Sequence, residues 1–220
     1  MWKMDRHGVL RTTCCARTER EFDANGHKPT CARSVVLLSG GIDSLVCAET
    51  ERQAGRLRGC VYVRYGQPSD ARESAAVVHY CKERDVPLRV AFVSGLHLGD
   101  MDGGGRGARV VPARNAMLLA IAANLADGLG ADQLVIGANA ADYRDYTDCR
   151  VPFLRSMTEA LGISVWAPLI AMSKAAIVAR AVELGIPRAS SWSCYGSGPE
   201  PCHACPSCIG ADAAWNGLSS

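Results

Sequence analysis

Five short runs of mainly apolar residues recur along the chain from residue 34 onward. They are rich in valine and other residues that favour strands, and polar or glycine-rich segments bound them. Runs of this length and composition are typical of buried strands. We therefore expect strands at residues 35–38, 60–64, 88–93, 133–136 and 164–166.

Between these runs, apolar residues recur at a spacing close to the 3.6-residue period of a helix. One set is Ala71, Ala75, Val78 and Cys81, another is Met117, Ile121, Asn124 and Leu125, and a third helix is expected over residues 173–184. Alternating strands and helices predict right-handed crossovers between parallel strands, with ligands at the carboxyl ends of the strands. The predicted fold is α/β, a five-stranded parallel sheet with helices on both faces.

The chain divides into three parts by composition. Residues 1–33 mix polar and charged residues without a regular period, so we expect a disordered leader outside the core. Residues 34–186 form the predicted α/β domain. Residues 187–220 are rich in glycine, proline, serine and cysteine and need something other than an apolar core to order them. The glycine-rich residues 99–107 are expected to form either a mobile lid or a plain surface loop.

Charge and cysteine content narrow the possible partners. The chain has 220 residues, a formal net charge of +2 and eleven cysteines, and its basic residues are scattered. Because no basic patch is visible, we expect small-molecule substrates and no nucleic acid. No signal-like segment and no long apolar run is present, so we expect a reduced, cytoplasmic protein that does not enter a membrane. A homodimer is expected because symmetric dimers are common.

A hexapeptide of small residues follows the first predicted strand, at the turn into a helix. Its residues are Ser39, Gly40, Gly41, Ile42, Asp43 and Ser44. Glycines let backbone N–H groups approach a phosphate, and Asp43 or Ser44 could cap the helix. The run lacks the lysine of a Walker loop and the spacing of a dinucleotide fingerprint. It resembles the pyrophosphate loop of N-type ATP pyrophosphatases, and the alternative is an ordinary glycine-rich turn.

Four cysteines near the end of the chain have the spacing of a metal site. They are Cys194, Cys202, Cys205 and Cys208. Two residues between thiolates allow neighbouring sulfurs to reach one tetrahedral ion, so we predict a closed structural zinc site that orders this segment. An iron–sulfur cluster is the main alternative. His203 lies within the cluster but is expected to be a bystander, because four thiolates already complete the shell.

Several further motifs occur in a fixed order between residues 34 and 208. They read RYGQ at 64–67, VPARN at 111–115, GANAADY at 137–143, YTDCR at 146–150, PL at 168–169 before Lys174, and WSCY at 192–195. Together they resemble the 7-cyano-7-deazaguanine synthase (QueC) family of the N-type ATP pyrophosphatase superfamily. The resemblance implies an ATP-dependent ligase that converts 7-carboxy-7-deazaguanine and ammonia to the nitrile, an intermediate for queuosine, with ATP, Mg²⁺ and Zn²⁺ as cofactors.

The matching motifs suggest roles for individual residues. We expect catalytic contributions from three aspartates, Asp43, Asp142 and Asp148. Positive charge is expected from Arg114, Arg150 and Lys174. The two later aspartates would hold Mg²⁺ or bind the N–H groups of the base. Substrate contacts are expected from Gln67, Asn115, Tyr146 and Trp192. Surface ion pairing, turn formation and ordinary packing are the alternative roles for these residue types.

The chain departs from the family pattern at several places, and the segment between Val93 and Val111 is short. Pro68 and Ser69 stand where Arg and His are usual, Thr147 stands where Pro is usual, and Ala211 occupies about the place of an Arg. These differences leave open a divergent member that passes an activated carboxylate to another amine or stops at the amide. A further alternative is a non-catalytic zinc module that binds nucleic acid or protein, against which the lack of a basic patch argues.

Overall fold

The computed structural model describes residues 2–4, 10–12, 32–96, 98 and 111–218. Within the expected disordered leader, β1 (Trp2–Met4) and β2 (Leu10–Thr12) pair antiparallel as a sheet of their own. The sequence analysis did not predict these two strands, because residues 1–33 lack a regular apolar period. Residues 99–107, expected to form a mobile loop, a lid or a plain surface loop, lie outside the described residues.

The main sheet confirms the predicted architecture. Its strands are β3 (Ser34–Leu37), β4 (Leu57–Arg64), β5 (Leu88–Phe92), β6 (Gln133–Val135) and β7 (Ser164–Trp166). All neighbours pair in parallel, in the spatial order β5-β4-β3-β6-β7. The first strand of this sheet, β3, lies in its middle. The chain adds β4 and β5 on one side of β3 and then β6 and β7 on the other. The strand order therefore reverses beside β3, and parallel sheets bind ligands at such a switch point.

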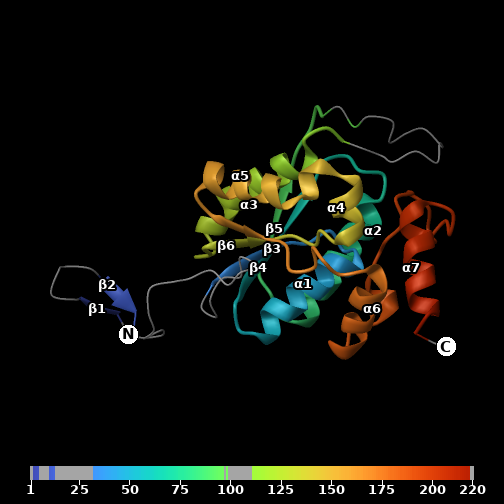
Figure 1. The fold of residues 1–220 in the computed structure, drawn as a ribbon, viewed down its shortest axis with the longest axis horizontal. Coiled ribbons are helices and arrows are strands. Elements are labelled where there is room, and N and C mark those ends of the chain that lie inside the picture. The colour runs from blue at the N-terminus through green and yellow to red at the C-terminus, as the bar shows by residue number, and fades with distance from the viewer. Residues whose placement is uncertain (1, 5–9, 13–31, 97, 99–110, 219–220) are drawn as a thin grey trace.

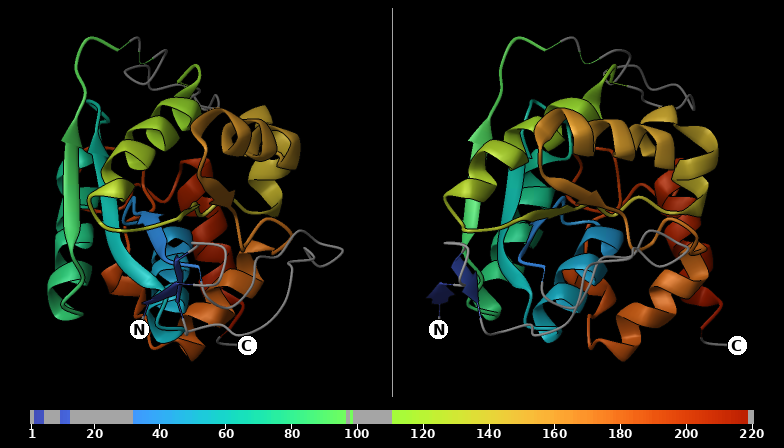
Figure 2. Two further views of the ribbon diagram at one scale, coloured as in Figure 1. Left: turned by 90° about the vertical axis from the view of Figure 1, so that its left-hand side faces the viewer. Right: turned by 60° about the vertical axis from the view of Figure 1, so that its left-hand side comes forward.

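Helices cover both faces of this sheet, as Figures 1 and 2 show. The described helices are α1 (Ile42–Gln53), α2 (Asp70–Glu83), α3 (Arg114–Asp127), α4 (Ala140–Asp145), α5 (Val151–Leu161), α6 (Lys174–Glu183) and α7 (Pro206–Asn216). Single 3-10 turns lie at Thr147–Cys149 and Arg188–Ser190. One apolar core joins α1, α2 and α6 to the sheet, and a second joins α3 and α5 to its other face.

The predicted helix α2 is present, but the apolar positions that indicated it are not the ones that it buries. The helix buries Val77, Tyr80 and Cys81, whereas three of the residues used for the prediction are exposed: Ala71, Ala75 and Val78. In α3 the fully buried residues are Leu119, Ala122 and Ala126 rather than the predicted set. Alanine fits either face of a helix, so an alanine-rich pattern indicates the helix but not its orientation.

A buried carboxylate anchors α1, the helix that follows the small-residue loop. Glu49 is 2% exposed and accepts hydrogen bonds from Arg52, Gln53, Tyr80 and Arg84. Burial alone would raise the pKa of Glu49, but the bonds from Arg52 and Gln53 hold it at about 2. This network ties the second half of α1 to the end of α2.

The C-terminal cysteine segment packs onto the α/β domain. Helix α7 lies against α6, and Trp215 packs on the core that α1, α2 and α6 share with the sheet. Earlier in this segment, the backbone N–H of Trp192 donates a hydrogen bond to the Gly40 carbonyl at 2.8 Å. Residues 187–218 therefore form one wall beside the carboxyl end of β3. None of the described helices has the length and apolarity needed to cross a membrane.

Candidate active site

A cavity of about 270 Å³ lies at the carboxyl ends of β3, β4 and β6, where the fold predicts a ligand site. Most of the predicted site residues line it: Ser39, Gly41, Ile42, Asp43, Ser44, Gln67, Arg114, Asn115, Asp142, Tyr146, Lys174 and Trp192. Gly40, Asp148 and Arg150 are not among its lining residues. Residues that are far apart in sequence thus meet at one end of the sheet.

The loop after β3 is held by its two serine side chains. The Ser44 hydroxyl donates to the Gly41 carbonyl at 2.9 Å and accepts the Ser39 amide at 3.2 Å. The N-cap of α1 is Gly41, which has no side chain, so the expectation that Asp43 or Ser44 caps this helix is wrong. The uncapped first turn leaves backbone N–H groups facing the cavity, which suits an anion.

Gly40 faces away from the cavity and toward α2. Its φ is +78°, and a Cβ built there would lie 2.8 Å from the Glu73 carbonyl oxygen. The backbone of the loop therefore packs directly on the backbone of α2, and only glycine fits between them. The role of Gly40 is to shape the loop rather than to line the ligand site.

Asp43 and Lys174 form an ion pair in the cavity. Lys174 Nζ donates to Asp43 Oδ2 at 2.5 Å, and Asn139 Nδ2 reaches the same oxygen at 3.4 Å. Asp43 Oδ1 is buried and has no hydrogen-bond partner among the described residues. A carboxylate oxygen without a partner in a cavity is suited to bind a cation or a donor from a ligand.

Asp142 adds a second carboxylate to this cavity wall. Its Oδ2 accepts a hydrogen bond from the backbone N–H of Asn139 at 3.0 Å. The Asn139 side chain in turn caps the start of α4, so the two residues form a capping box. Burial, and then the neighbouring charge of Asp43, raise the pKa of Asp142 above its usual 3.8, although Lys174 opposes this shift. The asparagine at position 139 thus holds both carboxylates in place.

Arg114 supplies positive charge from the start of α3. Burial disfavours its charged form, but the nearby Tyr65, Tyr195 and Asp148 raise the pKa of its guanidinium above the usual value, and Tyr65 also hydrogen-bonds to it. With Lys174 on the other side of the loop, the cavity wall contains two basic side chains and the three carboxylates of Asp43, Asp142 and Glu73. This arrangement can bind a polyphosphate together with a divalent ion.

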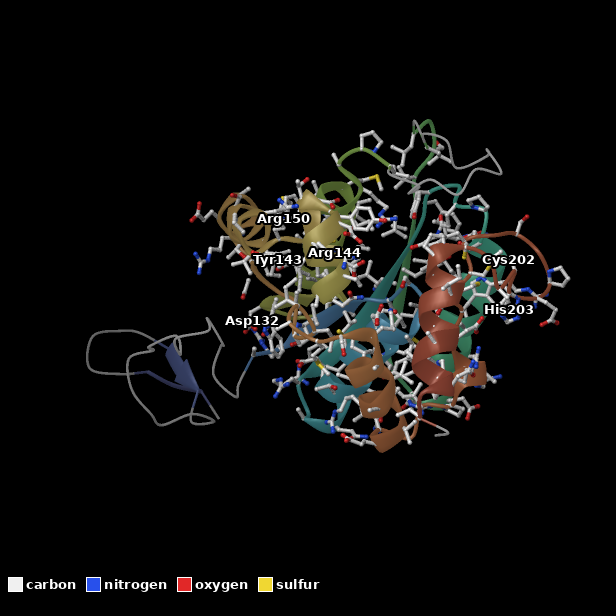
Figure 3. The ribbon with its side chains drawn as sticks, turned by 45° about the vertical axis from the view of Figure 1, so that its right-hand side comes forward. Asp132, Tyr143, Arg144, Arg150, Cys202 and His203 are labelled. Carbon is white, nitrogen blue, oxygen red and sulfur yellow. The ribbon has the colours of Figure 1, made fainter. Side chains whose placement is uncertain are left out.

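The structure does not bring Asp148 and Arg150 to the cavity. Asp148 Oδ2 accepts a hydrogen bond from the backbone N–H of Asn115 at 3.3 Å, and the Asp148 carbonyl accepts one from Asn115 Nδ2 at 3.1 Å. Asp148 therefore fixes the start of α3. Arg150 donates to the carbonyls of Tyr143 and Arg144 at 3.0 and 3.1 Å, and Figure 3 shows these three side chains together. Both residues hold the loop after α4 in position.

Gln67 lines the cavity, yet its polar atoms bond to the protein. It is 4% exposed; its Nε2 donates to Tyr62 Oη at 3.1 Å and Glu73 Oε2 at 3.1 Å, and its Oε1 accepts the Tyr65 amide at 2.9 Å. Burial raises the pKa of Glu73. Ser69, which stands where the family carries a basic residue, donates to Glu73 at 2.7 Å. This side of the cavity is therefore an internally bonded, acidic network.

Several lining residues were not predicted from the sequence: Tyr62, Tyr65, Glu73, Ser193, Tyr195 and Ser207. Tyr65 and Tyr195 lie inside the motifs described above, Tyr65 two residues before Gln67 and Tyr195 next to Cys194, so their position was a usable signal. Glu73 lies in the first turns of α2 and carries no such signal, since acidic residues are common near helix starts.

The four predicted cysteines come together as one cluster. The Sγ atoms of Cys194, Cys202, Cys205 and Cys208 all lie within 4.8 Å of one another, so this donor set could hold a metal ion. Backbone N–H groups of Ala204 and Cys205 lower the pKa of the Cys202 thiol to about 6.

His203 stays outside the cluster, as expected. Its Nδ1 lies 2.7 Å from Asp212 Oδ2, and Figure 3 shows it in the exposed loop beside Cys202. Asp212 also pairs with Arg188.

The fold and the cavity define an adenine nucleotide α-hydrolase-like α/β protein with an additional four-cysteine cluster. Its structure resembles that of NMN synthetase from Francisella tularensis, with a TM-score of 0.53 and 14% identity over 77% of this chain and 70% of that one, which shows the fold alone. The family model described as "Queuosine biosynthesis protein QueC" matches residues 33–219. The chain therefore belongs to the QueC family, which confirms the resemblance found in its motifs.

Curated relatives agree with this assignment. A 7-cyano-7-deazaguanine synthase from Synechococcus sp. (strain RCC307) is 36% identical over 206 residues, covering 82% of this chain and 93% of the relative. Another, from Koribacter versatilis (strain Ellin345), is 37% identical over 203 residues, covering 80% of this chain and 86% of the relative. The likeness thus extends over nearly the whole length of these proteins.

Proposed function

We propose that this protein is an ATP-dependent ligase that converts 7-carboxy-7-deazaguanine and ammonia to 7-cyano-7-deazaguanine. The observation that carries the proposal is that the cavity at the carboxyl ends of the sheet collects the family's motif residues from the whole chain. Relatives of matching length carry the name of this activity. An uncapped helix start, the basic side chains of Arg114 and Lys174, and the carboxylates of Asp43 and Asp142 are also groups that suit adenylation.

The chemistry proceeds in two activations. The substrate carboxylate attacks the α-phosphorus of ATP, pyrophosphate leaves, and ammonia then displaces AMP from the acyl adenylate to form the amide. The amide oxygen attacks a second ATP, again expelling pyrophosphate. Loss of that oxygen with AMP, and of the remaining protons from nitrogen, leaves the nitrile. Both attacks concentrate negative charge on phosphate oxygens, which explains the need for fixed donors.

The phosphates of ATP would lie against the first turn of α1. The N–H groups left open by Gly41 face the cavity, and Lys174 and Arg114 lie among its lining residues. Lys174 is already oriented by its 2.5 Å bond to Asp43, so little reorganisation is needed when charge develops on the leaving pyrophosphate.

Two metals fit side chains that are present. Mg²⁺ would bind at Asp43, whose buried Oδ1 lacks a partner in the described chain, with Asp142 near it, and would neutralise phosphate charge. Zn²⁺ would bind the four clustered cysteines, since a closed shell of four thiolates is a structural site. Zinc would thereby hold in place the segment that carries Trp192 and Tyr195 into the cavity.

The deazapurine would bind between the aromatic side chains of the cavity. Tyr146, after α4, and Trp192, in the C-terminal segment, both line the cavity. The Trp192 indole N–H is buried without a partner among the described residues. A planar base could stack on Tyr146 and accept the indole N–H of Trp192 at its edge. Arg72 lies 5.5 Å from the centre of the Trp192 ring and holds it from outside.

One reaction tests the proposal. The zinc-loaded protein is incubated with ATP, magnesium, ammonium and 7-carboxy-7-deazaguanine, and the deazapurine products are followed by mass at the acid, amide and nitrile. We expect the nitrile together with AMP and pyrophosphate. The absence of AMP would exclude adenylation.

Amide as the end product, or transfer to another amine, would favour a divergent activity instead. The specific observation behind that second candidate is that Ser69, bonded to Glu73, occupies a position where the family usually has a basic side chain.

A further inference from the structure

Glu73, in the first turns of α2, differs from the other carboxylates of the cavity in its neighbours. Asp43 pairs with Lys174, and the charge of Lys174 also acts on Asp142. Glu73 lines the same cavity. In the described part of the chain it accepts hydrogen bonds from neutral groups and forms no ion pair, and Asp70 is the charged group nearest in effect. The Glu73 carboxylate therefore meets the cavity without a neutralising cation from the described chain.

Three neutral donors hold this carboxylate and leave one acceptor position open. Glu73 Oε1 accepts from the Ser69 hydroxyl at 2.7 Å. Glu73 Oε2 accepts from Gln67 Nε2 at 3.1 Å and from the Tyr62 hydroxyl at 3.4 Å. Since a carboxylate has about four acceptor positions, two on each oxygen, one position on Oε1 has no donor among the described residues. A partly desolvated carboxylate with an open acceptor position is suited to an N–H group of a ligand.

An open donor lies beside this acceptor on the same side of the cavity. The Trp192 indole N–H is buried and has no partner in the described chain. Gly40 lies between the two residues, because its carbonyl accepts the backbone N–H of Trp192 and a Cβ built on it would lie 2.8 Å from the Glu73 carbonyl oxygen. Arg72, the residue before Glu73 in α2, lies 5.5 Å from the centre of the Trp192 ring. This wall therefore presents an acceptor and a donor together.

We propose that Glu73 determines specificity for the amino group of the base. Its Oε1 accepts an N–H of the exocyclic 2-amino group, while Trp192 Nε1 donates to N3, the ring nitrogen beside that group. A guanine-type ring carries this donor and this acceptor next to each other on one edge. Ammonium also has N–H donors, but it has no acceptor for the indole. The inference rests on the proposed function, because it takes the deazaguanine as the ligand.

The assignment gives the carboxylates of the cavity separate roles. Asp43 and Asp142, which lie near Lys174, remain available for Mg²⁺ and the phosphates. Asp142 and Asp148 were the residues expected to bind the N–H groups of the base, but Asp148 does not line the cavity. Glu73 takes over that recognition from the wall formed by α2.

Calorimetric titration of the full, zinc-loaded chain tests the proposal. The two ligands are 7-carboxy-7-deazaguanine and 7-carboxy-7-deazahypoxanthine, which lacks only the 2-amino group. We expect the unchanged chain to bind the first about 10- to 100-fold more tightly, as a hydrogen bond to a charged group allows. Glu73→Leu should bind both with equal affinity. Glu73→Gln should keep only a small preference, because a neutral oxygen is a weaker acceptor. If circular dichroism shows that Glu73→Leu is unfolded, Glu73→Gln decides the test.

Asp70→Asn is the matched control. Asp70 accepts a hydrogen bond from the same Tyr62 hydroxyl at 2.9 Å, but it is not among the residues that line the cavity. This variant neutralises a carboxylate of the same network and should keep the full preference for the amino-bearing base. An undiminished preference in Glu73→Gln would overturn the proposal. So would an equal loss in Asp70→Asn, because the effect would then come from a general disturbance of the network.

The KM for ammonium in the AMP-forming reaction separates the other use of this carboxylate. If Glu73→Gln raises that KM and leaves the preference between the bases unchanged, Glu73 binds ammonium and the proposal is overturned. Failure of the proposed function gives a different result: the unchanged chain would bind neither base and would form no AMP, which removes this inference as well. Failure of the inference alone leaves base binding and AMP formation intact in the unchanged chain.

Discussion

The replacement Gly40→Ala tests whether close backbone packing shapes the loop before α1. Gly40 has φ of +78°, a conformation that costs a residue with Cβ about 1–2 kcal/mol. The new methyl group would also lie 2.8 Å from the Glu73 carbonyl oxygen and 3.1 Å from Ala76 Cβ. Since backbone must move to relieve the first contact, we add about 1–3 kcal/mol for overpacking.

Gly55→Ala is the control for this experiment. Gly55 has φ of +70°, and a Cβ there meets nothing within 4 Å, so only the conformational cost applies. We expect Gly40→Ala to lower the free energy of unfolding by about 1–3 kcal/mol more than the control does. The shift of α2 away from the loop should also weaken ATP binding in the variant but not in the control.

Urea unfolding and calorimetric titration with ATP and magnesium measure these two effects. The free energy of unfolding is compared between the two variants. The slope of this free energy against urea concentration should be the same in both, because a different slope would indicate a change in the unfolded state. If Gly40→Ala is no more destabilising than Gly55→Ala, the contact with Glu73 does not constrain the loop and the reasoning fails.

Three further predictions follow from the cavity and the cluster. Lys174→Met should lower kcat/KM for AMP formation about 10²- to 10³-fold by removing a fixed cation, whereas the exposed Lys82→Met should not; equal activity of the two variants would contradict the phosphate role. Burial raises the pKa of Asp142, so the folded state loses stability as pH rises from the unfolded value through the folded one. Asp142→Asn should therefore be more stable than the unchanged chain at neutral pH, with a difference that vanishes in acid, as urea unfolding at several pH values would show; a constant difference would refute this. Cys205→Ala should lose zinc, measured by metal analysis, and should change the fluorescence of the tryptophans in the C-terminal segment, while Cys47→Ala, outside the cluster, should retain zinc.

Local features of the chain explain why much of the fold was predictable. Each strand is a compact β-favouring run, and every predicted strand is present with ends that differ by at most a few residues. Ser173 was expected beside a helix start, and its side chain does accept the Ala176 amide at 3.2 Å. The four cysteines were predictable because their short spacing restricts where the thiolates can lie.

The roles of Asp148 and Arg150 could not be read in this way. Both lie in a motif with Tyr146, which does line the cavity, yet their side chains bond to Asn115 and to carbonyls of α4. Neighbours in a loop point in different directions, so a shared motif does not imply a shared site. The orientation of α2 was equally open, since its alanines fit either face.

The sequence by itself determined the strand–helix alternation, the small-residue turn after β3 and the grouping of the thiols, because each depends on residues that are close along the chain. Only the tertiary structure decided that Asp43 meets Lys174, that Gly40 packs on α2 and that Trp192 completes the cavity wall. Those contacts depend on how helices and the C-terminal segment pack around the sheet, and packing depends on the shape of the whole core.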